Sequence, residues 1–127
     1  MKKEFSTKWK SSTKVRKQRK YAYNAPLHIK GKFLGAHLSQ DLIKKYGKRS
    51  LRVRKEDKVK IMKGQFHGKI GKVSRVDLKK TKVFIENIEL IKKDGSKIPY
   101  GIHPSNLMII EPNFSDKLRV KRLEAKK

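Results

Sequence analysis

The sequence predicts a mainly β protein: a small SH3-like barrel with a basic, partly helical N-terminal extension and a basic C-terminal tail. Three observations lead to this fold class. Residues 57–73 have the pattern of a strand, a loop bent by glycines and a second strand. Short apolar segments separated by turn residues continue to residue 110, as in small barrels. Residues 1–24 contain almost no aliphatic side chains, so they add little to a core.

The central strand–loop–strand pattern sets the geometry of the predicted barrel. Val59 and Ile61 alternate with lysines, which is typical of a strand with one buried face. Gly64 and Gly68 bracket a short loop, because glycine adopts the positive φ angles that tight turns need. Gly71 lies inside the second strand, where an isolated glycine indicates a bulge or a tight bend.

Four further strands complete the predicted barrel. Asp94 and Gly95 are a strong signal for a two-residue hairpin turn between two of them. Pro99 cannot donate a ladder hydrogen bond, so its strand is expected at an edge of the sheet. The expected strands are residues 82–86, 88–91, 98–102 and 107–110.

A dense run of positive charge, residues 14–20, lies in the N-terminal extension. Ser12 or Thr13 could cap a helix there, but like charges at helical spacing oppose its formation. We expect this arm to be disordered in the free protein and to become helical against phosphates. Pro26 ends any such helix, since the residue before a proline avoids the helical region. The next segments are expected to be extended over 26–29 and a loop over 31–35.

The clearest helix of the extension begins after Ser39 and ends at Gly47. Ser39 is expected to cap its start, and Gly47 suits the left-handed conformation at its end. Leu42, Ile43 and Tyr46 form the face that we expect to be buried. Because so short a helix is marginal alone, it must dock on the barrel.

The charge of the chain points to a polyanionic partner. The 36 basic and 11 acidic residues give a formal net charge of +25, which repels itself in a compact fold. Nucleic acid is the first candidate partner, and an anionic membrane surface is the second. No apolar run reaches the length of a membrane span, and no apolar signal core follows the first lysines.

The distribution of charge and aliphatic residues divides the chain into three parts. Residues 1–49 are a basic extension with short helices, residues 50–112 are the barrel, and residues 113–127 are a basic tail. The tail from residue 115 onward is expected to be helical, with Leu118 and Arg122 on one face.

The residues that carry most catalytic and metal chemistry are absent or scattered. The chain has no cysteine, which excludes disulfides and thiolate metal sites and is compatible with a cytosolic protein. The segment 64–70 has a glycine spacing one residue too short for a phosphate-binding loop, and Ile70 replaces the Ser or Thr that would hold magnesium. The four histidines are far apart in sequence. We therefore expect no enzyme activity, no catalytic residues, no metal and no cofactor.

Phosphate binding is the chemistry that the sequence does offer. Lysine and arginine neutralise phosphates, and arginine adds a bidentate fork. Trp9, Tyr21, Tyr23 and Phe66 lie among the basic residues and could stack on splayed bases; for Phe66, packing over the barrel mouth is an equal alternative. The expected RNA contacts are Lys14, Arg16, Lys17, Arg19, Lys20, Asn24, His28, Lys48, Arg49, Arg52, Arg54, Lys63, Phe66, His67, Lys69, Lys72, Arg75 and His103.

Residues 57–73 resemble the KOW motif, in which an aspartate, alternating aliphatic residues and spaced glycines precede an apolar strand. The structural positions of the motif are Asp57, Gly64, Gly68 and Gly71. Glu56 departs from the motif, which often has glycine there, and this departure weakens only the turn into the first strand.

Ordered motifs from residue 11 to residue 116 resemble the large-subunit ribosomal protein twenty-four family in its archaeal and eukaryotic form. The motifs are residues 16–20, 24–28, 45–51, the KOW stretch, 94–95 and 102–106. The resemblance implies a cytoplasmic ribosomal protein that binds large-subunit rRNA near its 5′ end, acts early in assembly and lies near the rim of the peptide exit tunnel. Its implied partners are neighbouring large-subunit proteins and nascent-chain or exit-tunnel factors, without membrane insertion.

Two other functions compete with this interpretation. A KOW-type transcription elongation factor would carry a further domain before the barrel, but residues 1–50 are too basic and too poor in aliphatic residues to form one. A peripheral membrane protein held by charge would need an amphipathic helix with a bulky apolar face, which the sequence lacks.

Overall fold

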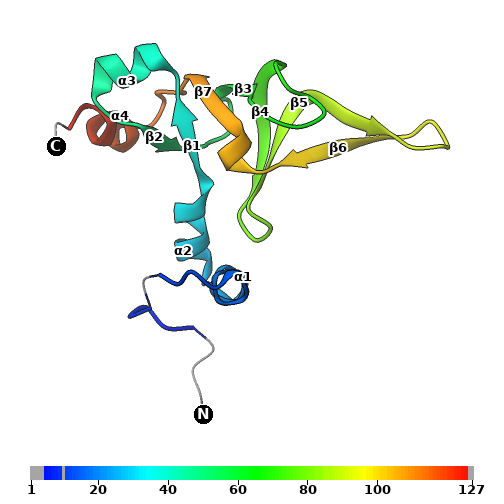
Figure 1. The fold of residues 1–127 in the computed structure, drawn as a ribbon. Helices are drawn as coiled ribbons and strands as arrows, with labels where there is room; N and C mark the ends of the chain where they lie inside the picture. Colours follow the sequence, from blue (N-terminus) through cyan, green and yellow to red (C-terminus); the bar gives the residue numbers. More distant parts are fainter. Residues whose placement is uncertain (1–4, 10, 126–127) are drawn as a thin grey trace.

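Seven strands form one sheet at the centre of the protein (Figure 1), as a computed structural model of residues 5–9 and 11–125 shows. The strand order is β2-β1-β7-β3-β4-β5-β6. The strands are β1 (Gly35–Leu38), β2 (Ser50–Arg52), β3 (Lys58–Ile61), β4 (Ile70–Asp77), β5 (Lys82–Ile91), β6 (Lys97–Ile102) and β7 (Leu107–Glu111). The helices are α1 (Val15–Asn24), α2 (Leu27–Lys30), α3 (Gln40–Tyr46), α4 (Lys117–Glu124), and the 3-10 turns η1 (Gly31–Leu34) and η2 (Pro104–Asn106).

The predicted mainly β class is confirmed, and the sheet is consistent with a small SH3-like fold. All strand pairs are antiparallel except β1 with β7, which is parallel. Val59 and Ile61 of β3 are buried, as their alternation with lysines predicts. They lie in one core cluster with Val73, Leu107 and Ile109 from the neighbouring strands. Burial of these aliphatic side chains is the main stabilising contribution.

The third and fourth predicted strands are one long strand, β5, which is a correction. Asn87 adopts a positive φ of 62° and the register with β6 shifts between Phe84 and Glu89, so the strand bends without ending. Pro99 lies in β6, which is an edge strand as predicted. The hairpin turn is confirmed, but Lys92 N–H donates to Ser96 O, so the loop is longer than two residues.

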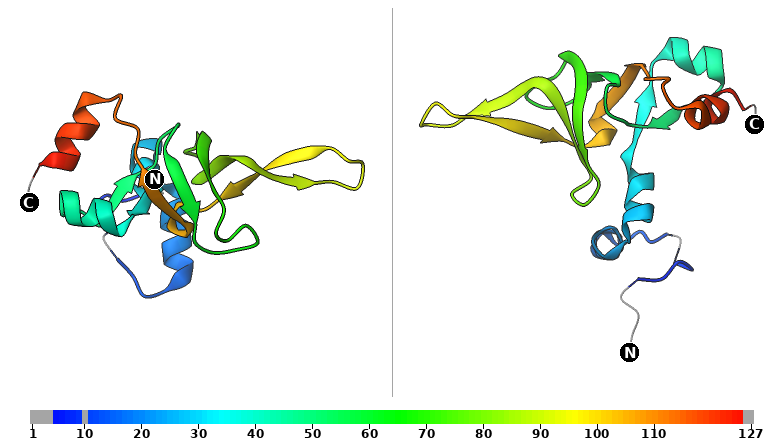
Figure 2. Two further views of the ribbon diagram at one scale, coloured as in Figure 1. Left: turned by 90° about the horizontal axis from the view of Figure 1, so that it is seen from above. Right: turned by 180° about the vertical axis from the view of Figure 1, so that it is seen from behind.

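The β5–β6 hairpin extends away from the rest of the protein (Figures 1 and 2). Every residue from 91 to 100 is exposed. The tip of the hairpin is therefore held mainly by its own ladder and turn, whereas its base contributes buried side chains to the core.

The structure of the N-terminal half differs from three of the sequence-based expectations. The first helix begins after Lys14, and no side chain caps it, so the expected Ser12 or Thr13 cap is wrong. Residues 26–29 are not extended, since α2 begins directly after Pro26. A proline is tolerated at the start of a helix, where its missing N–H would have no partner within the helix. Residues 31–34 form η1, and the following segment is the unpredicted strand β1. The sheet thus includes a strand from the segment that the sequence assigns to the extension, and the three-part division stays a prediction.

The helix α3 has the predicted signals. Ser39 Oγ accepts a hydrogen bond from Leu42 N–H, and Gly47 ends the helix with a φ of 64°. The three residues expected on its buried face are half-buried and pack against the core: Leu42, Ile43 and Tyr46. Docking on the barrel is therefore confirmed.

The tail forms the predicted helix, α4, and Leu118 and Arg122 lie on one face of it, which is the exposed face. The buried residues are Arg119 and Leu123. Because Arg119 is charged, its burial needs a specific partner. That partner is Asp57, the aspartate of the KOW motif.

The KOW glycines serve two different geometries. Gly64 and Gly68 have φ angles of 101° and 84°, which a residue with a side chain rarely adopts. Gly71 is not the bulge, since the register of β4 shifts between Val73 and Arg75; instead a Cβ there would lie 2.6 Å from Ile85 Cγ2. Glu56 has a φ of 68°, which explains why glycine is common at this position of the motif.

Candidate nucleic-acid interface

Three of the predicted RNA contacts line one recess on the barrel. Arg52 ends β2, Arg54 lies in the turn before β3, and Arg75 lies in β4. The recess has a volume of about 810 Å³, and Lys55, Glu56 and two serines also line it. Residues distant in sequence thus place four cations around one space. Guanidinium groups are donors that suit phosphate oxygens, whereas the Ser74 hydroxyl already donates to the carbonyl of Phe84.

Each arginine of the recess is positioned by a different contact. The Arg52 guanidinium lies against Gly31, where a Cβ would be only 2.7 Å from Nη2. The Arg75 guanidinium carbon lies 4.4 Å from the centroid of the Phe84 ring, a cation–π geometry. Among the residues that the structure describes, neither Arg52 nor Arg75 forms an ion pair. Their charge is therefore available to an external anion.

Arg54 is the exception, because its guanidinium pairs with the carboxylate of Asp116. The hydrogen bond from Arg54 holds the pKa of Asp116 below its usual value, and the backbone N–H of Leu118 acts in the same direction. Asp116 also caps α4. Arg54 therefore links the recess to the C-terminal helix.

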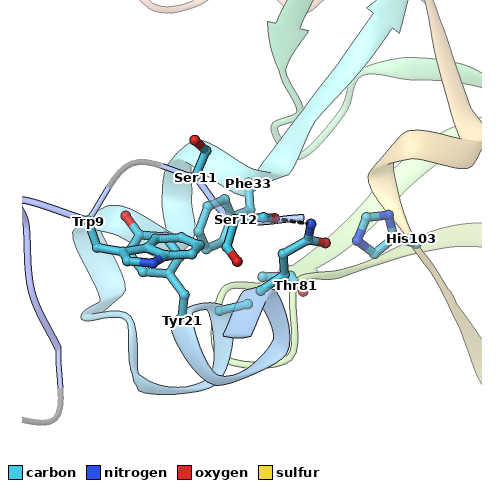
Figure 3. Close-up of a pocket in the computed structure, with 9 residues that line it drawn as sticks. Trp9, Ser11, Ser12, Tyr21, Phe33, Thr81 and His103 are labelled. Atoms are coloured by element: carbon cyan, nitrogen blue, oxygen red, sulfur yellow. Dashed lines mark hydrogen bonds between the residues drawn. The ribbon is translucent and has the colours of Figure 1, made fainter. Parts of the chain in front are cut away.

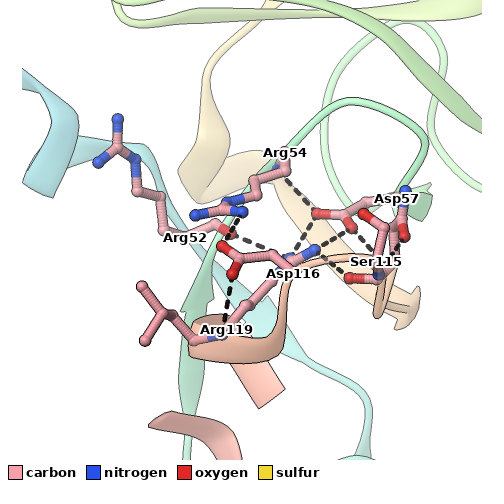
Figure 4. Close-up of polar contacts among 8 residues, drawn as sticks. Arg52, Arg54, Asp57, Ser115, Asp116 and Arg119 are labelled. Carbon is pink, nitrogen blue, oxygen red and sulfur yellow. Dashed lines mark hydrogen bonds and ion pairs between the residues drawn. The ribbon is translucent and has the colours of Figure 1, made fainter. Parts of the chain in front are cut away.

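A buried ion pair lies behind the recess (Figure 4). Arg119 donates to both oxygens of Asp57, over 2.6 and 2.7 Å, and their side chains are 4% and 0% exposed. Asp57 also accepts from the backbone N–H groups of Arg54 and Asn113. Arg119 further donates to the carbonyl of Arg52. The pair therefore fixes the backbone on both sides of Val53, at Arg52 and at Arg54.

The predicted contacts of the N-terminal arm lie on the surface of α1 and α2. No residue of α1 is buried. Asn24 is half-buried and His28 is exposed. The exposed cations of the arm are Lys14, Arg16, Lys17, Arg19 and Lys20.

The β3–β4 loop presents cations around a buried ring. Phe66 is only 9% exposed and packs on Tyr100, with 5.3 Å between the ring centroids. Lys69 Nζ lies 5.2 Å from the centroid of the Phe66 ring. Phe66 therefore packs on the barrel, which is the second of the two alternatives that the sequence left open for it. The exposed predicted contacts of this region are Lys63, His67, Lys69 and Lys72.

The remaining predicted contacts are separate from the arginine recess. Lys48 is half-buried and Arg49 is exposed, both between α3 and β2. His103 precedes η2, where its Nδ1 accepts from the backbone N–H of Ser105 over 3.3 Å. Burial and the positive charge of Lys82 lower the pKa of His103, so its ring favours the neutral form.

Two residues of the site were missed by the sequence analysis. Lys55 follows Arg54 directly, so the basic run itself was a sufficient signal. Nothing in the sequence around Arg119 indicates that it is buried, because basic residues with an occasional aspartate nearby are common throughout this tail. The described part of the chain contains no group of three potential metal-ligating His, Asp or Glu side chains. Within that part, no helix is long and apolar enough to cross a membrane.

Comparison with known proteins gives one family. The family model that describes the ribosomal proteins L26 of eukaryotes and their L24 counterparts of archaea matches residues 12–126. The chain is also similar to the large ribosomal subunit protein uL24 of Methanocorpusculum labreanum. The two are 48% identical over 116 residues, which cover 91% of this chain and 96% of that protein.

Proposed function

This chain belongs to the uL24 family of large-subunit ribosomal proteins, and from its cationic surfaces we propose that it binds the ribosomal RNA of that subunit. The family is a structural, non-enzymatic one, so the protein's task is binding and architecture rather than catalysis. The observation that carries the proposal is the recess in which Arg52 and Arg75 gather and form no ion pair among the described residues. The one acidic residue that lines it, Glu56, accepts a hydrogen bond from the Asn113 amide instead. Such preformed cations bind a phosphate backbone with little rearrangement.

The finer role is carried over from the family resemblance. We propose that the rRNA contacted lies near the 5′ end, that binding occurs early in assembly, and that the protein sits near the rim of the exit tunnel. Neighbouring large-subunit proteins and nascent-chain or exit-tunnel factors are the proposed protein partners, in a cytoplasmic ribosome. Protein–RNA crosslinking in lysate, followed by sequencing of the attached RNA, tests the location. Crosslinks confined to distant parts of the rRNA would contradict it.

The alternative function, a KOW-type transcription elongation factor, predicts a different partner. Family membership and a sheet that incorporates β1 favour the ribosomal role. Co-sedimentation of the protein with large subunits at increasing salt separates the two. Recovery of the protein with RNA polymerase and its absence from subunits would favour the alternative.

The arm provides a quantitative test of phosphate binding. Replacing Arg16, Lys17, Arg19 and Lys20 by alanine removes four exposed charges, and each neutralised phosphate adds roughly 0.7–0.9 to the slope of log affinity against log salt. The slope should fall by up to about 3–4, while the unfolding midpoint of the barrel stays unchanged.

The matched control removes four exposed lysines outside the proposed contacts. They are Lys92, Lys93, Lys97 and Lys117. This control should change the salt slope less than the arm variant does. Equal slopes for both variants would mean that net charge, rather than the proposed surface, governs binding.

A second pair of variants tests the recess itself. Arg52→Gln with Arg75→Gln should weaken RNA binding, because both residues line the recess and neither forms an ion pair in the described chain. Arg122→Gln with Lys121→Gln, on the exposed side of α4, is the control of equal charge. If both double variants bind RNA equally well, the recess is not the interface.

A further inference from the structure

A second recess lies where the N-terminal arm meets the barrel (Figure 3). Its volume is about 530 Å³, within the range of roughly 300–1,000 Å³ typical of small-molecule sites. Trp9 and Tyr21 come from the arm, and Phe33 comes from η1. Thr81 of the β4–β5 turn and His103 before η2 contribute from the barrel.

The arm side of the recess is an aromatic cluster. Tyr21 packs on Trp9 and on Phe5, with ring centroids 4.5 and 4.9 Å apart. Phe33 meets Tyr21 edge to face at 6.2 Å. All four rings are half-buried, whereas the rings of a closed core would be hidden from solvent. Three of them, Trp9, Tyr21 and Phe33, therefore offer π surface to a ligand.

The barrel side of the recess offers hydrogen bonds without charge. Because His103 Nδ1 accepts from Ser105 N–H, the neutral ring carries its proton on Nε2, which can donate. Gln18 of α1 donates its amide to the carbonyl of Ser12 over 2.6 Å, which orients the amide at the rim. The lining contains hydroxyl, amide and imidazole groups but no Lys, Arg, Asp or Glu among the described residues.

Two lysines lie next to this uncharged lining. Gln18, Tyr21 and Ala22 of α1 line the recess, and Lys14 is the N-cap residue of that helix, where its carbonyl accepts from the backbone N–H of Gln18 over 3.2 Å. Lys82 follows Thr81 directly in the chain and lines a small neighbouring cavity together with His103. The recess can therefore hold a flat, uncharged group against its aromatic rings, and the two lysines can bind a negatively charged group beside it. A nucleotide has this distribution, with a neutral base and an anionic phosphate.

We propose that the recess formed by Trp9, Tyr21, Phe33 and His103 receives one unpaired nucleobase of RNA. The base stacks on the aromatic cluster, and the adjoining phosphates lie near Lys14 and Lys82. This inference rests on the proposed RNA binding and deepens it, since it assigns a site for single-stranded or bulged RNA. Proteins commonly read RNA through splayed bases stacked on aromatic side chains.

Trp9 is the only tryptophan of the chain, so its fluorescence reports on the recess directly. The full-length protein is titrated with a short blunt RNA duplex and with the same duplex carrying one bulged adenosine. The bulged RNA should quench Trp9 in a saturable manner, and the blunt duplex should leave it nearly unchanged. Binding of both labelled RNAs is followed in parallel by fluorescence anisotropy.

Trp9→Leu keeps an apolar side chain beside Tyr21 but removes the stacking surface. It should lower the affinity for the bulged RNA by about 5- to 150-fold, the range expected when one base–aromatic stack is lost. The affinity for the blunt duplex should stay unchanged. Phe33→Leu should act in the same selective direction. Tyr23→Ala is the matched control, because Tyr23 belongs to the same arm, is 83% exposed and lies outside the recess.

The outcomes separate this inference from the proposed function. If both RNAs bind the protein but anisotropy shows the same preference for the bulged RNA in Trp9→Leu and Phe33→Leu as in the parent, and Phe33→Leu keeps the parent's Trp9 quenching, the recess does not hold a base, and RNA binding stands. Quenching by an apolar peptide but by neither RNA would assign the recess to a protein segment and overturn the inference. If neither RNA binds at low salt, the proposed function fails as well.

Discussion

Arg119→Met should lower the free energy of unfolding by about 3–5 kcal/mol, because it leaves the buried Asp57 carboxylate without its cationic partner. Arg119 donates four hydrogen bonds, two to Asp57 and one each to the carbonyls of Asn113 and Arg52. Methionine fills similar space but replaces none of them. Since small domains have about 5–15 kcal/mol of stability, this single change removes a large share of the total.

Asp57→Ala should be at least as damaging as Arg119→Met. It leaves a guanidinium that is 4% exposed without its carboxylate, and it also removes the acceptor of two backbone N–H groups, those of Arg54 and Asn113. The double variant should lose about as much as Asp57→Ala alone, because the second change no longer breaks an intact pair. The coupling energy then isolates the contribution of the pair.

Urea unfolding followed by circular dichroism measures these differences, and Arg122→Met is the matched control. Arg122 lies on the same helix but is exposed, so its replacement should stay within about 0.5 kcal/mol of the parent. Equal small effects of Arg119→Met and Arg122→Met would refute the reasoning. So would additive losses in the double variant, since they would show that the two side chains act independently.

Further predictions concern the glycines and a histidine. Gly71→Val should cost about 1–3 kcal/mol, because its Cβ would lie 2.6 Å from Ile85 Cγ2; an unchanged melting temperature with weaker RNA binding would instead place Gly71 at the RNA surface. Gly68→Ala should cost about 1–2 kcal/mol through its φ of +84° alone, and Gly68→Asn should recover part of this in the same melting assay. His103 has a folded pKa below its ordinary 6.5, because burial and Lys82 disfavour its charge. Its contribution to stability is thus present above pH 6.5 and is lost as the pH falls through the folded pKa. The urea midpoint of the parent protein should therefore fall with pH over this range, and the midpoint of His103→Asn should fall less. An equal fall for both proteins would contradict the assignment.

The strands of the barrel could be predicted where burial imposes alternation. Val59 and Ile61 are an example, since their side chains must enter the core while Lys58 and Lys60, which alternate with them, stay partly exposed to solvent. β1 could not be predicted in this way. Its residues Gly35 and His37 have little preference for strands, and it exists because β2 and β7 supply partners on both sides.

The candidate site was predictable in its residue types and not in its grouping. Composition and motif resemblance point to Arg52, Arg54 and Arg75 as phosphate contacts, yet only the register of β3, β4 and their neighbours brings these arginines into one recess. Arg119 was hidden for a related reason. A buried arginine becomes recognisable only when the carboxylate that compensates it, 62 residues earlier in the chain, is in place.

The two ends of the chain are attached to the barrel by contacts of different strength, and this difference predicts how RNA engages them. α4 is held by a buried ion pair and by Leu123, so the arginine recess beside it is formed before RNA arrives. α1 has no buried residue and no side-chain cap, and a helix of ten residues is marginal alone. A base in the aromatic recess would contact the arm and the barrel at once, which stabilises the arm in place. Amide exchange over residues 13–24 should therefore slow over the same RNA concentrations that quench Trp9. Strong protection of these amides without RNA would show that the arm is already folded, and coupled ordering would be wrong.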